Sequence, residues 1–131
     1  MCARSVPVVE KSAPLISVID DDASLRRAIM SLVRSAGYSA SGHESAEAFL
    51  ASNEAGRSAC IVTDLQMPGM SGIDLKAELD NRVVETPVIM ITARTEAPLL
   101  AQAEASGAAC LLRKPFEAEA FIKCLDRALA A

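Results

Sequence analysis

The sequence LISVIDDD, residues 15–22, joins a short apolar run to three consecutive aspartates. A nearly continuous apolar run of this length is typical of a strand that is buried on both faces of a parallel sheet. Apolar residues then recur at helical spacing from Leu25 to Val33, and we expect that helix to stop near Gly37. A strand followed by a helix is the repeating unit of parallel α/β sheets.

The same alternation continues along the rest of the chain. Further strands are expected at 38–41, 59–63, 88–91 and 109–112, and further helices at 45–50, 73–81, 98–105 and 121–129. Ser71 and Asp74 resemble a capping box ahead of the third helix. Five such units predict an α/β fold of the flavodoxin-like type, a doubly wound five-stranded parallel sheet in the order 2-1-3-4-5 with helices on both faces.

Length and composition fit one globular domain. The chain has 131 residues, of which 51% are hydrophobic and 23% charged. We expect residues 1–14 to form a flexible tail and residues 15–131 to form the domain. The net charge of -4 and the absence of a basic stripe disfavour direct nucleic-acid binding. No apolar run reaches the roughly 18 residues of a membrane span, so we expect a cytoplasmic protein with no membrane contact.

The cysteines show no metal-binding or redox spacing. Cys60, Cys110 and Cys124 are interpreted as buried small hydrophobic residues, and Cys2 as an exposed thiol in the tail. The single histidine, His43, cannot complete a zinc site of the usual form, and we expect it in a surface loop without a role.

Polar residues follow the predicted strands at the edge where ligands of parallel α/β sheets bind. They are Asp20, Asp21 and Asp22 after the first strand, Asp64 after the third, Thr92 after the fourth and Lys114 after the fifth. Each has a purely structural explanation on its own, and Asp22 suits a helix N-cap. Together, the carboxylates would lie close enough to require a cation, and oxygen ligands favour Mg²⁺.

Four of these strand ends carry motifs of a known family. They are VIDDD (18–22), VTDLQMPGMSG (62–72), MITA (90–93) and LLRKPF (111–116). In this order and spacing the chain resembles a receiver domain of the two-component response regulators. The segments MPGMSG (67–72) and SAEAFL (45–50) most resemble receivers of the nitrogen-fixation type, which often precede a helix-turn-helix DNA-binding domain.

The resemblance implies a role for each motif residue. Asp64 would accept a phosphoryl group from the phosphohistidine of a sensor histidine kinase or a histidine phosphotransfer protein, and the domain would catalyse its own phosphorylation and dephosphorylation. Mg²⁺, or Mn²⁺ in its place, would be held by Asp20, Asp21, Asp64 and the backbone carbonyl of Gln66. Lys114 and Thr92 would contact the phosphoryl oxygens.

Other positions would control the signal. A cis peptide before Pro115 would position Lys114, with a trans proline at the start of the last helix as the alternative. Leu111 stands where the family usually has an aromatic residue that moves with Thr92. Gln66 and Arg94 would set the phosphoryl lifetime. The fourth helix, fifth strand and last helix would form the switching face and a possible homodimer contact.

Several alternatives stay open from the sequence. The chain could be a stand-alone receiver or a fragment of a DNA-binding regulator. A Mg²⁺-dependent phosphatase with an aspartate nucleophile is a second class, although such enzymes usually have an acid where Gln66 stands. A flavodoxin-like cofactor binder lacks the aromatic residues that a flavin needs. A receiver-like binding module with an inert site is the remaining alternative.

Overall fold

The computed structural model describes residues 13–130. The predicted tail and Cys2 therefore lie largely or wholly outside the described residues. Within 13–130, no helix is both long enough and apolar enough to cross a membrane. In chain order the elements are β1 (Leu15–Ile19), α1 (Ala23–Ser35), β2 (Ser39–His43), α2 (Ala46–Ala51), the 3₁₀ helix η2 (Ala55–Arg57), β3 (Cys60–Asp64), α3 (Gly72–Asn81), β4 (Val88–Thr92), α4 (Ala97–Ala105), β5 (Cys110–Arg113) and α5 (Ala118–Ala130).

The five strands form one parallel sheet in the order β2-β1-β3-β4-β5, as predicted. Strand β1 lies between β2 and β3, with Ile16 opposite Cys60 and Ile19 opposite Thr63. On the other side of β3, Asp64 lies opposite Ile91. The chain winds outward in both directions from β1 and β3, so the ends of these two strands form the crevice in which such sheets bind ligands.

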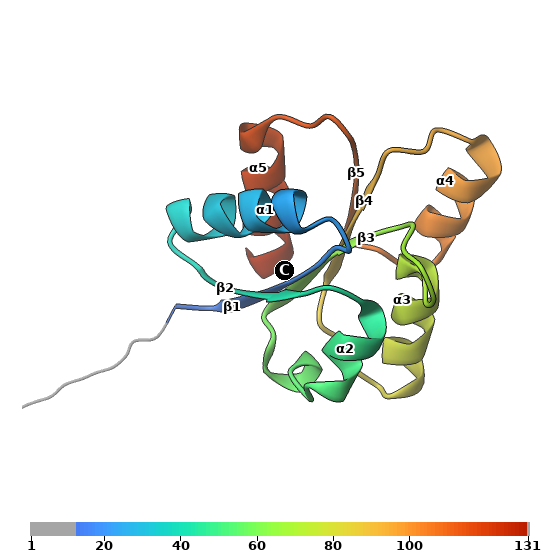
Figure 1. Cartoon of the computed structure of the whole chain (residues 1–131), viewed down its shortest axis with the longest axis horizontal. Helices are drawn as coiled ribbons and strands as arrows, with labels where there is room; N and C mark the ends of the chain where they lie inside the picture. Colours follow the sequence, from blue (N-terminus) through green and yellow to red (C-terminus); the bar gives the residue numbers. More distant parts are fainter. Residues whose placement is uncertain (1–12, 131) are drawn as a thin grey trace, which may run out of the picture.

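Helices cover both faces of the sheet, in two groups (Figure 1). Helices α1 and α5 pack on one face around Ile29, Val33 and Phe121, and α2, α3 and α4 pack on the other around Phe49 and Leu75. The side chains of β1, β3 and β4 supply both cores, which explains why their sequences are almost entirely apolar. Burying one such large side chain stabilises the fold by about 1.5–3 kcal/mol.

The start of α3 is fixed by the capping box that the sequence predicts. The Ser71 hydroxyl accepts from the Asp74 backbone N–H at 3.1 Å, and the Asp74 carboxylate accepts from the Ser71 backbone N–H at 3.3 Å. The next residue, Gly72, packs against the end of β3, where a Cβ atom would lie 2.7 Å from the carbonyl oxygen of Asp64. Glycine is therefore needed for α3 to begin so close to β3.

Strand β2 begins one residue later and ends two residues later than predicted. Tyr38, expected to open the strand, lies between the turn after α1 and β2, and its hydroxyl donates to Asp126 at 2.7 Å. The strand itself reads SASGH and is an edge strand, so it has no apolar run to mark its limits.

The expectation that His43 lies in a surface loop is wrong. His43 ends β2, its side chain is only 11% exposed, and its ring lies edge-on to Phe49. Its Nε2 lies 2.8 Å from Glu54 Oε2, which also accepts from the Ser17 hydroxyl, and Glu54 Oε1 accepts from the Ser41 hydroxyl. The histidine is part of a partly buried polar network between the sheet and the segment before η2.

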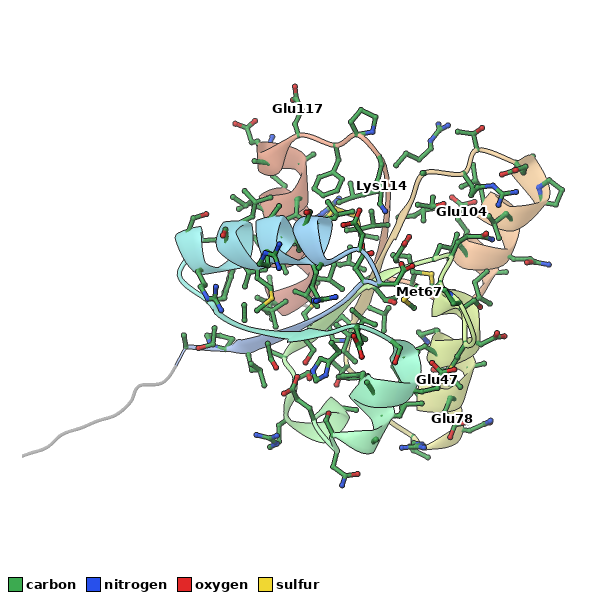
Figure 2. The ribbon with its side chains drawn as sticks, in the orientation of Figure 1. Glu47, Met67, Glu78, Glu104, Lys114 and Glu117 are labelled. Carbon is green, nitrogen blue, oxygen red and sulfur yellow. A yellow bond between two sulfur atoms is a disulfide. The ribbon has the colours of Figure 1, made fainter. Side chains whose placement is uncertain are left out.

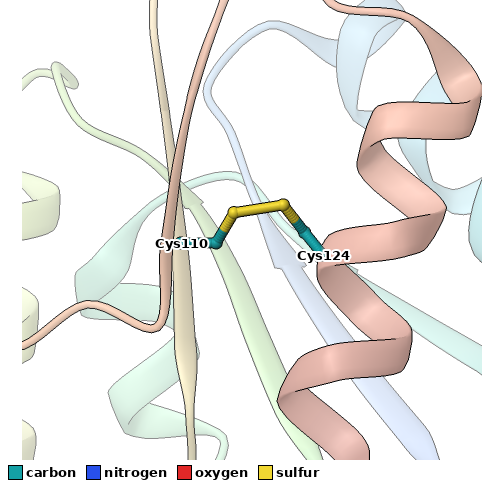
Figure 3. Close-up of a disulfide and its surroundings, with 2 residues drawn as sticks. All are labelled: Cys110 and Cys124. Carbon is teal, nitrogen blue, oxygen red and sulfur yellow. A yellow bond between two sulfur atoms is a disulfide. The ribbon is translucent and has the colours of Figure 1, made fainter.

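The predicted burial holds for Cys60 and Cys124, and Cys110 is partly buried against the same core, but the sequence did not reveal that Cys110 and Cys124 are paired. Cys60 is fully buried in β3, and burial raises the pKa of its thiol to about 12, which keeps it protonated. Cys110 in β5 and Cys124 in α5 form a disulfide, with their Cα atoms 6.2 Å apart (Figure 3). They are 14 residues apart in the chain and meet because α5 packs back on the sheet beside β5, a contact that local spacing cannot reveal.

Candidate functional site

The first acidic turn contains one structural aspartate and two that face the crevice. The Asp22 carboxylate accepts from the backbone N–H groups of Ser24 and Leu25 at 3.0 and 3.2 Å and so caps α1. Its N-cap assignment is confirmed. Asp20 and Asp21 precede this cap and are left free to interact with groups across the sheet edge.

Three carboxylates converge at the switch point, as predicted. Asp20 and Asp21 leave β1 and Asp64 ends β3, and one oxygen of each lies within 4.8 Å of the others. The strand register brings them together, because β1 and β3 are adjacent and parallel. Like charges at this separation repel one another unless a cation lies among them.

Lys114 supplies one positive charge at this cluster. Its Nζ lies 3.6 Å from Asp64 and 3.8 Å from Asp20, and Figure 2 shows the side chain at the carboxyl edge of the sheet. Lys114 directly follows β5, and the peptide between it and Pro115 is cis, as the resemblance implied. Lys114 follows the last strand of the sheet, yet it lies beside carboxylates that follow the first strand and end the third.

The positive charge of Lys114 does not fully offset the factors that raise the pKa values of Asp20 and Asp64. Burial raises the pKa of Asp20, and the nearby charge of Asp64 raises it further, despite a hydrogen bond from the Asp22 backbone and the charge of Lys114. Burial likewise raises the pKa of Asp64, although Lys114 and backbone N–H groups of Gln66 and Leu65 oppose it. Among residues 13–130, Asp20 Oδ2 is a buried oxygen with no hydrogen-bond partner. These features fit a divalent cation with oxygen ligands.

Thr92 closes the other side of the crevice. It ends β4, is fully buried, and its hydroxyl oxygen accepts from the backbone N–H of Arg94 at 2.9 Å. Since Asp64 is opposite Ile91, Thr92 lies one residue beyond that pair on the neighbouring strand. Leu111 lies in β5 opposite Met90 and packs against the core under α2, α3 and α4.

Gln66 and Arg94 meet at the rim of the crevice. The Arg94 guanidinium donates to the Gln66 side-chain oxygen at 3.0 Å and also to both carboxylate oxygens of Glu96. This contact links the loop after β3 to the loop after β4. Gln66 and Arg94 were both expected to set the phosphoryl lifetime, but nothing in the sequence pointed to their contact or to Glu96.

Two more residues that support the site were also missed. Arg26 of α1 donates to the backbone carbonyl of Asp20 at 2.7 Å, and Glu47 of α2 accepts from the backbone N–H of Met70 at 2.9 Å. Each residue binds the backbone of a loop that borders the crevice. Figure 2 labels Glu47 together with Met67, a residue of the loop that Glu47 binds. Both contacts are tertiary and follow no local spacing, so the sequence contains no signal for them.

Comparison with known proteins identifies the family. The model of the response regulator receiver domain matches residues 16–126. The chain is 40% identical over 114 residues to the transcriptional regulatory protein FixJ of Azorhizobium caulinodans, covering 87% of this chain and 54% of that protein. It is 34% identical over 130 residues to the response regulator protein TodT of Pseudomonas putida, covering 98% of this chain and 56% of the other. The chain thus spans about half the length of these curated relatives.

Solved structures agree with this match. The crystal structure of FixJ-N superposes with a TM-score of 0.82 at 32% identity, covering 92% of this chain and 96% of that one. A response regulator receiver protein from Burkholderia phymatum superposes with a TM-score of 0.78 at 40% identity, covering 89% and 95%. The fold, the strand-end motifs and these similarities together show that the chain belongs to the response regulator receiver domain family of two-component signalling.

Proposed function

We propose that Asp64 is the phosphoacceptor of this receiver domain and takes its phosphoryl group from a histidine kinase or a histidine phosphotransfer protein in a Mg²⁺-dependent reaction. The observation that carries this proposal is the position of the Asp64 carboxylate, which lies with Asp20 and Asp21 in one cluster and 3.6 Å from Lys114. A carboxylate can act as a nucleophile toward phosphorus where positive charge stabilises the transferred group.

In the proposed step, an Asp64 carboxylate oxygen attacks the phosphorus of the donor phosphohistidine. A phosphorus–oxygen bond to Asp64 forms while the phosphorus–nitrogen bond of the donor breaks. The electron pair of that bond stays on the imidazole nitrogen, which is then free to take a proton. The result is an aspartyl phosphate with close to two negative charges at neutral pH. The domain catalyses only this transfer to itself and its later hydrolysis.

The acidic cluster would hold the cation. Asp20, Asp21, Asp64 and the backbone carbonyl of Gln66 are the proposed ligands, and Mn²⁺ could replace Mg²⁺ there. When bound, the cation neutralises charge that develops on the transferred phosphoryl oxygens. The unpartnered, buried oxygen of Asp20 supports this assignment, because such an atom is costly to leave without a partner.

Lys114 and Thr92 are proposed to bind the phosphoryl oxygens. Lys114 already lies within 4 Å of two carboxylates and can reorient its ammonium group as a point charge. The Thr92 hydroxyl has a proton to donate, since its contact with the Arg94 backbone uses only a lone pair of the oxygen.

We propose that the output passes through Thr92 to the face made of α4, β5 and α5. Movement of Thr92 toward the phosphoryl group would break its contact with the Arg94 backbone and shift the loop before α4. Leu111, which has no ring or hydroxyl, would fill or vacate the space beside Thr92. Phosphorylation must favour the active state by about 5.5 kcal/mol to turn a 1:99 ratio into 99:1. This face is also the proposed homodimer contact.

The test is incubation with acetyl phosphate and Mg²⁺, followed by mass spectrometry of the intact chain. We expect a gain of about 80 Da, one phosphoryl group, in the parent and none in Asp64→Asn. Lys114→Ala should retain Mg²⁺ binding but label more slowly. A parent of unchanged mass would support an inert binding module instead, and equal labelling of parent and Asp64→Asn would place the nucleophile elsewhere.

A further inference from the structure

Glu96 occupies a helix terminus without capping it. It is the N-cap residue of α4, where a side chain usually accepts from the first backbone N–H groups of the helix. The Glu96 side chain makes no such hydrogen bond. Its carboxylate is turned to Arg94 instead, accepting from Nε at 3.0 and 2.8 Å through its two oxygens and also from Nη2. The contact is a fork, which fixes the plane of the guanidinium.

The remaining terminal nitrogen of Arg94 extends to the neighbouring loop. Nη1 donates to the Gln66 side-chain oxygen at 3.0 Å. Glu96, Arg94 and Gln66 therefore form a continuous chain of contacts, which we call the clasp. The clasp joins the loop after β4 to the loop after β3, and the contact between them is made by Arg94 and Gln66, which lie two residues beyond Thr92 and Asp64.

The clasp lies where water would enter the crevice that contains Asp64. Arg94 and Glu96 are each about half exposed, with side-chain exposed fractions of 50% and 49%, so the clasp lies at the solvent side of the crevice. Hydrolysis of an aspartyl phosphate needs a water molecule in line with the bond to the carboxylate oxygen. A bridge between the two loops would narrow the path by which such a water molecule reaches Asp64.

The negative charge of Glu96 also keeps the Arg94 side chain in place. Without Glu96, the guanidinium would lose the carboxylate with which it pairs. Its long side chain would then sample other positions and leave Gln66, because a single hydrogen bond to a neutral amide at an exposed site holds it weakly. Glu96 thus determines where the arginine lies.

We propose that Glu96 is a positioning residue for the phosphoryl site: it holds Arg94 against Gln66, and the clasp slows hydrolysis of the phosphoryl group by restricting water. This inference rests on the proposed function of Asp64.

The test measures how long the phosphoryl group survives. The purified chain is labelled with acetyl phosphate and Mg²⁺, freed of the donor by rapid desalting, and sampled for intact mass over time. We expect Glu96→Gln to shorten the half-life about threefold to tenfold, and Arg94→Ala to do the same. The double variant should match Arg94→Ala, because two residues of one chain of contacts act non-additively.

Two controls separate positioning from structure. Glu104→Gln removes an exposed carboxylate from the same helix and should leave the half-life unchanged. Thermal unfolding of Glu96→Gln should match the parent, whereas a merely structural role would lower its midpoint. Glu96→Asp keeps the charge and should restore part of the lifetime.

The outcomes are distinct. A parent that takes no label contradicts the proposed function and the clasp together. A parent that is labelled, with an unchanged or longer half-life in Glu96→Gln, contradicts the clasp alone. The proposal for the clasp is also contradicted if the double variant has a shorter half-life than Arg94→Ala alone.

Discussion

At the residue scale, Asp20 and Asp64 are held in a site that disfavours their charge. Burial raises the pKa of both, and their closeness to other carboxylates adds to this. As the pH rises above 3.8, the unfolded chain loses these protons before the folded one does. The folded state is then progressively less stable until the pH passes the raised pKa values, and the loss persists at neutral pH.

Asp64→Asn should therefore stabilise the protein when no divalent cation is present. The amide keeps the shape of the side chain and removes one charge from the cluster. We expect a higher midpoint of thermal unfolding at pH 7 in EDTA; a rise of a few degrees corresponds to roughly 1 kcal/mol in a domain of this length. Glu104→Gln, which removes an exposed charge outside the cluster, is the matched control. A lower midpoint in Asp64→Asn would contradict the electrostatic cost.

At the scale of elements, the strand ends were predictable and the contacts between loops were not. The buried strands β1, β3 and β4 are mostly apolar, and a polar residue either ends the strand or directly follows it, so their ends could be identified within a residue or so. The site residues follow from those ends and from the sheet order. The network at Glu54 and the pairing of Cys110 with Cys124 depend on which side chains meet after packing. The spacing of neighbouring residues in the sequence does not predict such contacts.

The Glu54 network links β1, β2 and the segment before η2. Burial alone would raise the pKa of Glu54, but hydrogen bonds from Ser17, His43 and Ser41 outweigh it and lower the pKa below its usual value. The stability that this provides is therefore fully present above pH 4.5 and is lost as the pH falls through the lowered value.

Glu54→Ala should cost about 2 kcal/mol of unfolding free energy, because it leaves the buried hydroxyl of Ser17 and the ring of His43 with fewer partners. Chemical denaturation at pH 7 measures the loss. The difference between variant and parent should shrink as the pH is lowered below 4.5. Glu44→Gln, at an exposed site beside His43, serves as control, and an equal loss there would argue against the network.

The end of α3 contains a residue poorly suited to its conformation. Val83 follows the C-cap Arg82, has a φ of 58° and is 78% exposed. The left-handed region is unfavourable for a β-branched residue, and glycine is preferred at this place after a helix. Val83→Gly should raise the unfolding free energy by about 1 kcal/mol. Val84→Gly, which empties a half-buried position on the core, should lower it; equal effects would contradict the conformational explanation.

At the scale of the whole molecule, the site exists only when distant parts of the chain have come together. Asp20 follows β1, Asp64 ends β3 and Lys114 follows β5, so the unfolded chain has no comparable cluster. Any cation that binds the cluster therefore stabilises the fold by mass action. The size of that effect depends on how tightly the folded state binds and not on the details of the ligands.

Mg²⁺ should stabilise the parent by about 2.7 kcal/mol at a hundredfold excess over its Kd. Thermal unfolding across a Mg²⁺ titration measures this directly. Asp21→Asn should remove most of the shift, since the exposed Asp21 belongs to the acidic cluster. Lys114→Ala should keep the shift or enlarge it, because the lysine competes with the cation for Asp20 and Asp64. A shift that survives in Asp21→Asn but disappears in Lys114→Ala would mean that the cation binds elsewhere and that the carboxylates meet only to hold the lysine.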